Sequence, residues 1–326
     1  MSVDLAKNFI QVLALDQFGK EVFSRKVSTP KLKELVQTRG PQKVLMEACS
    51  TAHYWGREFE KLGIEVVLIP PQLVTAMRVG DKNDANDCWA IFEASSRPKL
   101  KPVRIKSEEH QLLQTWLRRR DSLVAERTER VNAIRSYLAE AGYWIPKGIY
   151  KFRKVVVELL QQWSGNVRLR EILENDLEGL KHLASQIRFF DEKINHYAKT
   201  NPTCIALQKL GGIGPITAVA LVAAVVQPKD FKNGRWFAAY LGLVPRQNST
   251  GGKTKLYGIG KDGNAHLRRL LIHGGRSLIW SAPKKQDAVS QWALRKKIEK
   301  GFNKASVAVA NKNARMAWAV MAQMPA

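Results

Sequence analysis

The chain of 326 residues has only three cysteines, Cys49, Cys88 and Cys204, an odd number without paired spacing. This pattern excludes a disulfide framework and a zinc ribbon, and it fits a reducing compartment. No window of about 18 residues is both apolar and uncharged, so no membrane-spanning helix is expected. The opening residues, MSVDLAKNF, lack the apolar stretch of a secretory signal. We therefore expect a cytoplasmic protein with no membrane partner.

Acidic residues are scarce in the last third of the chain. Residues 201–326 contain 20 Lys and Arg but four Asp and Glu, whereas residues 1–100 contain 14 and 12; the whole chain carries a net charge of +24. A solubilising basic face is one explanation, but ordinary surfaces mix both signs. Lys and Arg neutralise the phosphates of nucleic acids, and such binding weakens steeply as salt rises. We expect the C-terminal third to bind nucleic acid.

The first hundred residues alternate between short apolar runs and helical patterns, which is typical of an α/β layer. We predict strands over 2–4, 9–15, 21–27, 44–46 and 65–69, and helices over 53–62 and 83–94. The composition, 45% apolar, is sufficient for two or three packed domains.

Helical spacing dominates the middle of the chain. One long helix is predicted over 108–140, and further helices over 152–163 and 167–199. The later pair suggests an antiparallel coiled-coil spacer. We divide the chain into an α/β domain at 1–148, which includes a long helix at about 107–141, a helical spacer at 149–200, and a mainly helical basic domain at 201–326.

A glycine-rich turn interrupts two helical runs at residues 207–223, LQKLGGIGPITAVALVA. This pattern is similar to a helix-hairpin-helix, in which backbone N–H groups at a helix N-terminus bind a phosphate. Gly212 and Gly214 are therefore candidate nucleic-acid contacts. An ordinary helical hairpin that uses glycine for close packing remains the alternative.

Four acidic residues form a candidate metal site. Asp4 ends the first predicted strand and Glu47 follows a later one, where burial would favour neutral residues. Asp84 and Asp87 share one face of a predicted helix because they are three residues apart. RNase H-like folds hold two divalent cations with such a set, and Mg²⁺ or Mn²⁺ prefers carboxylate oxygens. Asp81 paired with Asp84 is a rival choice.

A glycine-containing segment carries a candidate nucleophile, Ser249, which we expect in a loop before Gly251 and Gly252. A hydroxyl there could attack phosphorus if nearby cations offset the charge of the transition state. Ser249 and Thr250 could instead be turn residues or phosphate hydrogen-bond donors. The candidate phosphate-binding residues around them are Arg246, Lys253, Lys255, Lys261, Arg268 and Arg269.

Several strings together carry a resemblance: GLVPRQNSTGGKTKL, KDGNAHLRRLLIHGGR and the GIGP turn, with VDLAKN, LMEAC and KNDAND. The chain resembles the DEDD, RuvC-like transposases of bacterial insertion sequences, understood as bridge-RNA-guided recombinases. It is most similar to the subgroup with a GLVPRQ-S-T-GGK signature. Relatives usually carry K-T-D-x-x-D-A where this chain has Lys82 to Cys88, and Gly260 replaces a usual serine.

The resemblance implies an RNase H-like, RuvC-like N-terminal domain whose metal ligands are Asp4, Glu47, Asp84 and Asp87. It implies that Ser249 forms a covalent 5′-phosphoserine with DNA at a composite Mg²⁺-dependent site, the serine and the acids coming from different subunits. The implied partners are donor and target double-stranded DNA, a structured bridge RNA, and further copies forming a dimer that assembles to a tetramer. The implied location is the bacterial cytoplasm, at the nucleoid when DNA is bound.

Two other functions remain compatible with these residues. The same acids could activate water in a junction-type nuclease, with Ser249 only holding phosphate. The basic domain and the glycine hairpin could also belong to a non-catalytic nucleic-acid-binding scaffold, in which Asp84 would be dispensable.

Overall fold

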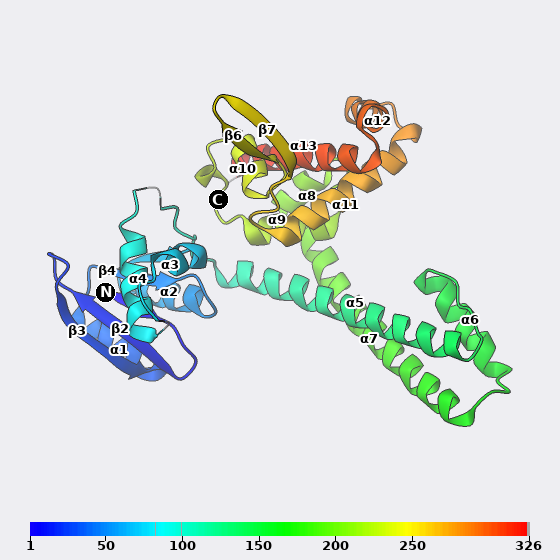
Figure 1. Cartoon of the computed structure of the whole chain (residues 1–326), viewed down its shortest axis with the longest axis horizontal. Helices are drawn as coiled ribbons and strands as arrows, with labels where there is room; N and C mark the ends of the chain where they lie inside the picture. The colour runs from blue at the N-terminus through cyan, green and yellow to red at the C-terminus, as the bar shows by residue number, and fades with distance from the viewer. Residues whose placement is uncertain (82, 99, 325–326) are drawn as a thin grey trace. The chain divides into compact units, whose positions relative to one another are not determined.

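The computed structural model describes residues 1–81, 83–98 and 100–324 (Figure 1). Lys82 of the KNDAND string lies outside these residues. The chain forms two compact units, Met1–Glu109 and His110–Ala326. The long helix that we grouped with the N-terminal domain, α5 (Glu108–Glu140), lies almost entirely in the second unit.

The first unit is built on a five-stranded sheet of order β3-β2-β1-β4-β5 (Figure 1). β1 pairs antiparallel with β2, β2 antiparallel with β3, and β1 parallel with β4, which is parallel to β5. The predicted strands are confirmed, with bounds β1 (Ser2–Asp4), β2 (Phe9–Leu15), β3 (Glu21–Ser28), β4 (Lys43–Glu47) and β5 (Glu65–Ile69).

Helices cover both faces of this sheet. α1 (Thr29–Arg39) and α2 (Ala52–Glu60) contribute Leu32 and Phe59 to a core that includes Met46. α3 (Pro71–Met77) and α4 (Asp84–Ser95) form a second core that includes Leu45. Consecutive residues of a strand face opposite sides of a sheet, which is why Leu45 and Met46 enter different cores. The unit is therefore a three-layer α/β/α arrangement, as the alternating pattern predicts.

The second unit begins with three helices: α5, α6 (Ile149–Gln161) and α7 (Val167–Thr200). Helices α5 and α7 run antiparallel, because Arg120 of α5 donates to Asp191 of α7 at 2.5 Å while Arg130 of α5 contacts Gly179 of α7. Helix α5, which we grouped with the N-terminal domain, is thus an additional partner of α7 in the spacer. The shorter α6 adds Phe152 to the core that α5 and α7 share.

The remainder of the second unit is mainly helical, as predicted, around one large core. Its helices are α8 (Pro202–Gln208), α9 (Pro215–Ala224), η1 (Pro228–Asp230), α10 (Gly234–Tyr240), α11 (Ala265–Ser281), η2 (Ala282–Lys284), α12 (Ala288–Lys300) and α13 (Phe302–Gln323). A two-stranded hairpin, β6 (Pro245–Thr250) and β7 (Lys253–Ile259), projects from this core. Among the described residues, no helix is both long and apolar enough to cross a membrane.

Candidate functional site

Two of the predicted acids lie side by side at one edge of the sheet. Asp4 is the last residue of β1 and Glu47 the last of β4. These neighbouring strands are parallel, and Val3 pairs with Met46, so the next residue of each strand is an acid. The carboxyl ends of parallel strands meet at the same edge of a sheet, and the two carboxylates therefore leave the sheet together.

The N-terminal turn of α4 brings the other two acids to this edge. Asn83 caps the helix by accepting a hydrogen bond from the backbone N–H of Asn86 at 2.8 Å. The buried thiol of Cys88 donates to the carbonyl oxygen of Gln11 at 3.3 Å, which holds α4 against β2. Asp87 immediately precedes Cys88 and Asp84 precedes it by about one turn, so both lie above the edge at which β1 ends.

The carboxyl group of Asp4 lies close enough to the other three acids to be affected by their charges. The pKa of Asp4 is raised from 3.8 to about 6, first by burial and then by the negative charges of Asp87, Asp84 and Glu47, while Arg78 opposes the rise. Burial, followed by the charge of Asp4, also raises the pKa of the Cys88 thiol to about 12. The edge of the sheet thus carries more negative charge than its surroundings neutralise.

Each of the two acids on α4, Asp84 and Asp87, forms a salt bridge with a cationic side chain. Lys26 of β3 forms a salt bridge with Asp84 at 2.6 Å, and Arg78 forms one with Asp87, which is largely buried. The sequence analysis missed both cations, and nothing in their spacing marks them, since Lys26 is distant in sequence and Arg78 lies in an irregular segment.

The four acids can be compared with what a metal ion requires of its ligands. Within the described ranges, no group of three or more His, Cys, Asp or Glu side chains is arranged to hold a metal ion. Asp84 and Asp87 are each paired with a cation, Lys26 and Arg78 respectively. The donor set itself fits a hard divalent cation, because all four groups are carboxylates and their mutual repulsion is relieved by positive charge.

The rival acid, Asp81, occupies a different setting. Asp81 is exposed and precedes α4, and its backbone carbonyl accepts a hydrogen bond from the side chain of Asn86 at 2.9 Å. The acids whose charges raise the pKa of Asp4 are Asp87, Asp84 and Glu47, and Asp81 is not among them.

Ser249 lies on a strand, not in the loop that the sequence analysis expected. It is the penultimate residue of β6 and pairs with Thr254 of β7. The turn between the strands is Gly251-Gly252, with φ of 56° and 76°. Positive φ at both central residues defines the tight turn that matches the twist of a hairpin, so these glycines serve the turn.

The pleat of the hairpin separates the side chains around Ser249 into two faces. Thr254, its partner, shares its face, as does Gln247 two residues earlier. Lys253 pairs with Thr250 and Lys255 with Asn248, so both lysines lie on the opposite face. Thr250 is thereby distinguished from Ser249, because the two hydroxyls point to opposite sides.

The Ser249 hydroxyl has two polar neighbours in this hairpin. The Gln247 side-chain amide donates to Ser249 Oγ at 2.7 Å, and Thr254 Oγ1 lies 3.2 Å from the same oxygen. Neither neighbour can accept a proton as a general base. Both orient the hydroxyl, and neither was singled out in the sequence analysis, although alternation along β6 and β7 would have placed them beside it.

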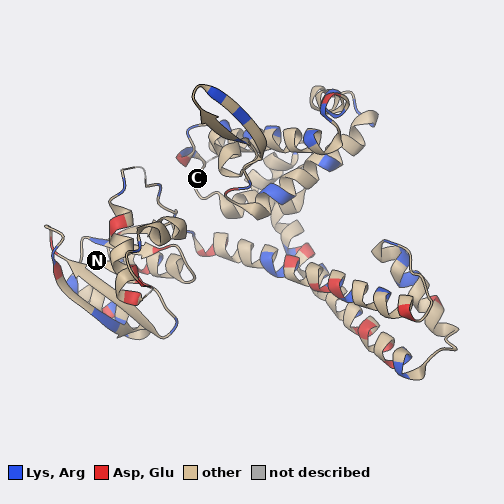
Figure 2. Ribbon diagram, viewed as in Figure 1, with Lys and Arg blue, Asp and Glu red and all other residues tan. Residues whose placement is uncertain are grey.

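The other predicted phosphate-binding residues have different environments. Arg246 is an exposed residue of β6, in a hairpin with basic and no acidic residues (Figure 2). Arg268 donates to the carbonyl oxygens of Leu241 and Asp262 at 3.0 and 2.6 Å, and Arg269 forms a salt bridge with Asp121 of α5. The structure thus gives these two arginines partners that brace the domain.

Two further predicted residues, Gly212 and Gly214, flank the turn between α8 and α9. Gly212 has a φ of 86° and lies so close to Gly274 of α11 that a Cβ there would be 2.6 Å from the Gly274 carbonyl oxygen. Gly214 is exposed and caps α9, with open space around its Cα. Close packing thus accounts for Gly212, and the cap leaves Gly214 accessible.

Comparisons with known proteins identify both parts of the chain. The family model described as "Transposase IS116/IS110/IS902 family" matches residues 204–290. A DEDD transposase model named after IS110 and described as "Transposase" matches residues 1–142.

Similar curated proteins extend over nearly the whole chain. A "Probable family 20 transposase" of Pseudomonas aeruginosa is 37% identical over 99% of this chain and 96% of its own. The "Transposase for insertion sequence element IS1111A" of Coxiella burnetii is 37% identical over 98% of this chain and 89% of its own. The "Transposase for insertion sequence element IS1328" of Yersinia enterocolitica is 32% identical over 99% and 96%.

Proposed function

The chain belongs to the IS116/IS110/IS902 family of insertion-sequence transposases, and we propose that it recombines DNA through a covalent bond to Ser249. Two observations support this. Ser249 is an exposed hydroxyl held by Gln247 and Thr254 on a hairpin without acidic residues. Asp4 and Glu47 end neighbouring parallel strands, and burial followed by the charges of Asp87, Asp84 and Glu47 raises the pKa of Asp4, a repulsion that a bound cation would relieve. The first observation carries the serine role, because it presents an exposed, oriented hydroxyl, and the second supports metal assistance.

Mg²⁺ or Mn²⁺ would be held by Asp4, Glu47, Asp84 and Asp87. Binding would require Asp84 and Asp87 to exchange Lys26 and Arg78 for the metal. The metal would supply Lewis acidity at the scissile phosphate and stabilise the oxygens that enter and leave. The strand order β3-β2-β1-β4-β5, with acids at the ends of β1 and β4, supports the RNase H-like, RuvC-like assignment of this unit.

Ser249 would act by transesterification. Ser249 Oγ loses its proton and bonds to phosphorus, the bond from phosphorus to the 3′ oxygen breaks, and that oxygen gains a proton, which leaves a free 3′-hydroxyl and a 5′-phosphate attached to serine. Attack by another 3′-hydroxyl on this phosphoserine would rejoin the DNA and release Oγ. Because no base accompanies Ser249 in its own hairpin, we propose that the acids of another subunit complete the site.

The cations have separate roles in this proposal. Arg246 and Lys261 would contact the DNA backbone near the root of the hairpin, while Lys253 and Lys255 would contact it near the Gly251-Gly252 turn, on the face opposite to Ser249. Arg268 and Arg269 would act from their braced positions, and Gly214 would offer its backbone N–H to a phosphate. The guide RNA and assembly of dimers into a tetramer follow from the proposed recombinase subgroup, and the charge of residues 201–326 supports a polyanionic partner.

The proposal is tested by trapping the covalent intermediate. The protein is incubated with Mg²⁺, the bridge RNA encoded beside its gene and the cognate donor and target DNA, and then separated under denaturing conditions. We expect a protein–DNA adduct that maps to Ser249, is absent in Ser249→Ala and persists in Thr250→Ala, the matched control on the opposite face. An adduct that survives Ser249→Ala would refute the serine role.

The same assay distinguishes the alternative functions. Cleavage to free 3′-hydroxyl and 5′-phosphate ends without an adduct would identify a metal-dependent nuclease. Full activity of Asp84→Ala would exclude any role of the acid cluster and indicate a nucleic-acid-binding scaffold.

A further inference from the structure

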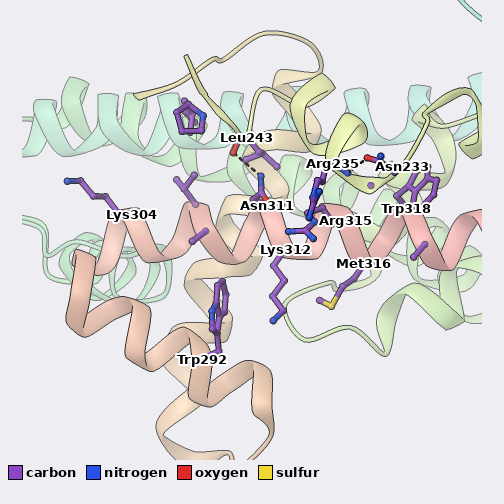
Figure 3. Close-up of a pocket in the computed structure, with 16 residues that line it drawn as sticks. Asn233, Arg235, Leu243, Trp292, Lys304, Asn311, Lys312, Arg315, Met316 and Trp318 are labelled. Atoms are coloured by element: carbon purple, nitrogen blue, oxygen red, sulfur yellow. Dashed lines mark hydrogen bonds between the residues drawn. The ribbon is translucent and has the colours of Figure 1, made fainter. Parts of the chain in front are cut away.

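The second unit contains a groove of about 970 Å³ that none of the residues assigned above explains (Figure 3). One wall is α13, the opposite wall is the start of α10 together with Leu243, and α12 contributes Trp292. Pro245 and Ile259, which pair at the root of the β6–β7 hairpin, also line it. The groove therefore ends where the strand that carries Ser249 begins.

The polar lining of the groove is entirely cationic or neutral. Its four charged residues are Arg235, Lys304, Lys312 and Arg315, and no Asp or Glu is among the described residues that line it. None of the four forms a salt bridge with a carboxylate in the part of the chain that the structure describes. Four cations in one concavity without a counter-ion create a strong local attraction for an anionic chain.

The remaining lining is apolar and aromatic. Val307, Ala308 and Met316 of α13 form its side, and the rings of Trp292 and Trp318 stand at separate points along the helix (Figure 3). Lys312 Nζ lies 4.5 Å from the centre of the Trp292 ring, so this face of the ring is already in contact with a cation. When Lys312 moves from the ring to a phosphate, this face becomes a platform on which an unpaired base can stack while its phosphates meet the cations.

The walls of the groove are fixed by contacts within the unit. Asn311 of α13 donates to the carbonyl oxygen of Leu243 at 3.2 Å, and Trp318 donates to that of Pro228 at 2.9 Å. Gly234 lies against the backbone of Arg315, where a Cβ would be 2.8 Å from the Arg315 carbonyl oxygen. The groove is therefore formed before any ligand arrives.

We propose that this groove binds an unpaired polynucleotide strand, with its bases on the Trp292 side and its phosphates on Arg235, Lys304, Lys312 and Arg315. A duplex keeps its bases stacked on one another, so it can use the cations but not the tryptophan. The inference rests on the proposed function, since it gives the recombinase a site for a separated strand next to the hairpin of Ser249. Single-stranded DNA and RNA share this chemistry.

The test measures binding by the full chain to fluorescein-labelled oligo(dT), oligo(U) and a mixed-sequence duplex over a range of salt. We expect Lys304→Ala/Arg315→Ala to lower the slope of log affinity against log salt by about 1.4 for the single strand, since each phosphate contact contributes about 0.7. A fourfold rise in salt would then cost the variant about sevenfold less affinity than it costs the wild type.

The matched control is Lys297→Ala/Lys300→Ala, which removes the same charge from exposed positions on α12 outside the groove. It should leave the slope within about 0.3 of the wild-type value.

Trp292 tests the stacking component. Trp292→Ala should weaken single-strand binding about fivefold to a hundredfold and duplex binding less than twofold, whereas Trp292→Phe, which keeps a ring and guards against misfolding, should retain most of the affinity. Comparing oligo(dT) with oligo(U) identifies whether DNA or RNA is the source of the strand.

Several results would overturn the inference. These are equal salt slopes for the groove variant and its control, equal losses of single-strand and duplex binding in Trp292→Ala, or tighter binding of an acidic peptide than of either oligonucleotide. The binding assay measures strand affinity without requiring an adduct, so failure of the phosphoserine test and failure of the groove test are separate outcomes.

Discussion

Replacing Asp4 by asparagine should stabilise the metal-free protein while abolishing recombination. Burial and the charges of Asp87, Asp84 and Glu47 raise the pKa of Asp4 from 3.8 to about 6. At pH 8 the ionised carboxylate therefore costs the folded state up to about 3 kcal/mol. Asp4 is partly solvated, and screening reduces this to about 1–2 kcal/mol. The Asp4→Asn variant should gain that amount in free energy of unfolding.

The sign of the pH dependence follows from the same values. Between pH 4 and pH 6 the folded protein binds more protons at Asp4 than the unfolded chain does. The contribution of Asp4 to the free energy of unfolding thus falls as pH rises through this window, and it stays low above pH 6. The Asp4→Asn variant should lack this decline.

The measurement is urea denaturation in the presence of EDTA at pH 5 and pH 8, with Glu192→Gln as a control that removes an exposed acid from α7. Mg²⁺ should raise the stability of the wild type and leave Asp4→Asn nearly unchanged, because the metal would bind only the complete acid cluster. An Asp4→Asn variant no more stable than the wild type at pH 8 would refute the reasoning that these acids repel one another.

Two further predictions concern glycines. Gly212→Ala should lower the free energy of unfolding by about 2–4 kcal/mol, because the φ of Gly212 is positive and a Cβ there would meet the Gly274 carbonyl oxygen. The control Gly214→Ala should change it by less than about 1 kcal/mol. Equal effects in urea denaturation would contradict the close packing of the Gly212 turn against α11. In the hairpin turn, Gly252→Val should abolish adduct formation at Ser249 with little change in global stability, because valine does not tolerate the positive φ of this residue. Gly251→Asn should retain adduct formation, because asparagine tolerates positive φ. A fully active Gly252→Val would show that the turn does not position the serine.

In the α/β unit, the strands that are most apolar relative to the flanking residues could be located from the sequence. β4 and β5 are short apolar runs with polar ends, so their positions follow from the sequence. The sequence does not show that β1 and β4 are parallel neighbours, because strand pairing depends on the tertiary structure. This pairing brings Asp4 close to Glu47. The salt bridges of Lys26 and Arg78 were beyond prediction because no periodicity relates them to Asp84 and Asp87.

The hairpin of Ser249 shows the opposite case. β6 reads PRQNST and every one of its residues is exposed, so no burial pattern marks it as a strand. The Gly251-Gly252 pair was the available signal, since two glycines between extended segments favour a tight hairpin turn. The part of α5 in the helical spacer was not predicted for another reason: α5, α6 and α7 all carry apolar stripes, and stripes alone do not say which helices pack together.

The placement of Ser249 has a consequence for the safety of the host chromosome. The side chain of Ser249 is exposed on the two-stranded β6–β7 hairpin. Its hydrogen-bonding neighbours, the amide of Gln247 and the hydroxyl of Thr254, cannot accept its proton. A lone serine of this kind is chemically inert toward phosphodiesters. In the proposed mechanism, a chance contact with DNA would therefore not lead to cleavage. Cleavage would require other groups to assemble around that oxygen, which would couple the first cut to the presence of the groups needed to rejoin the DNA.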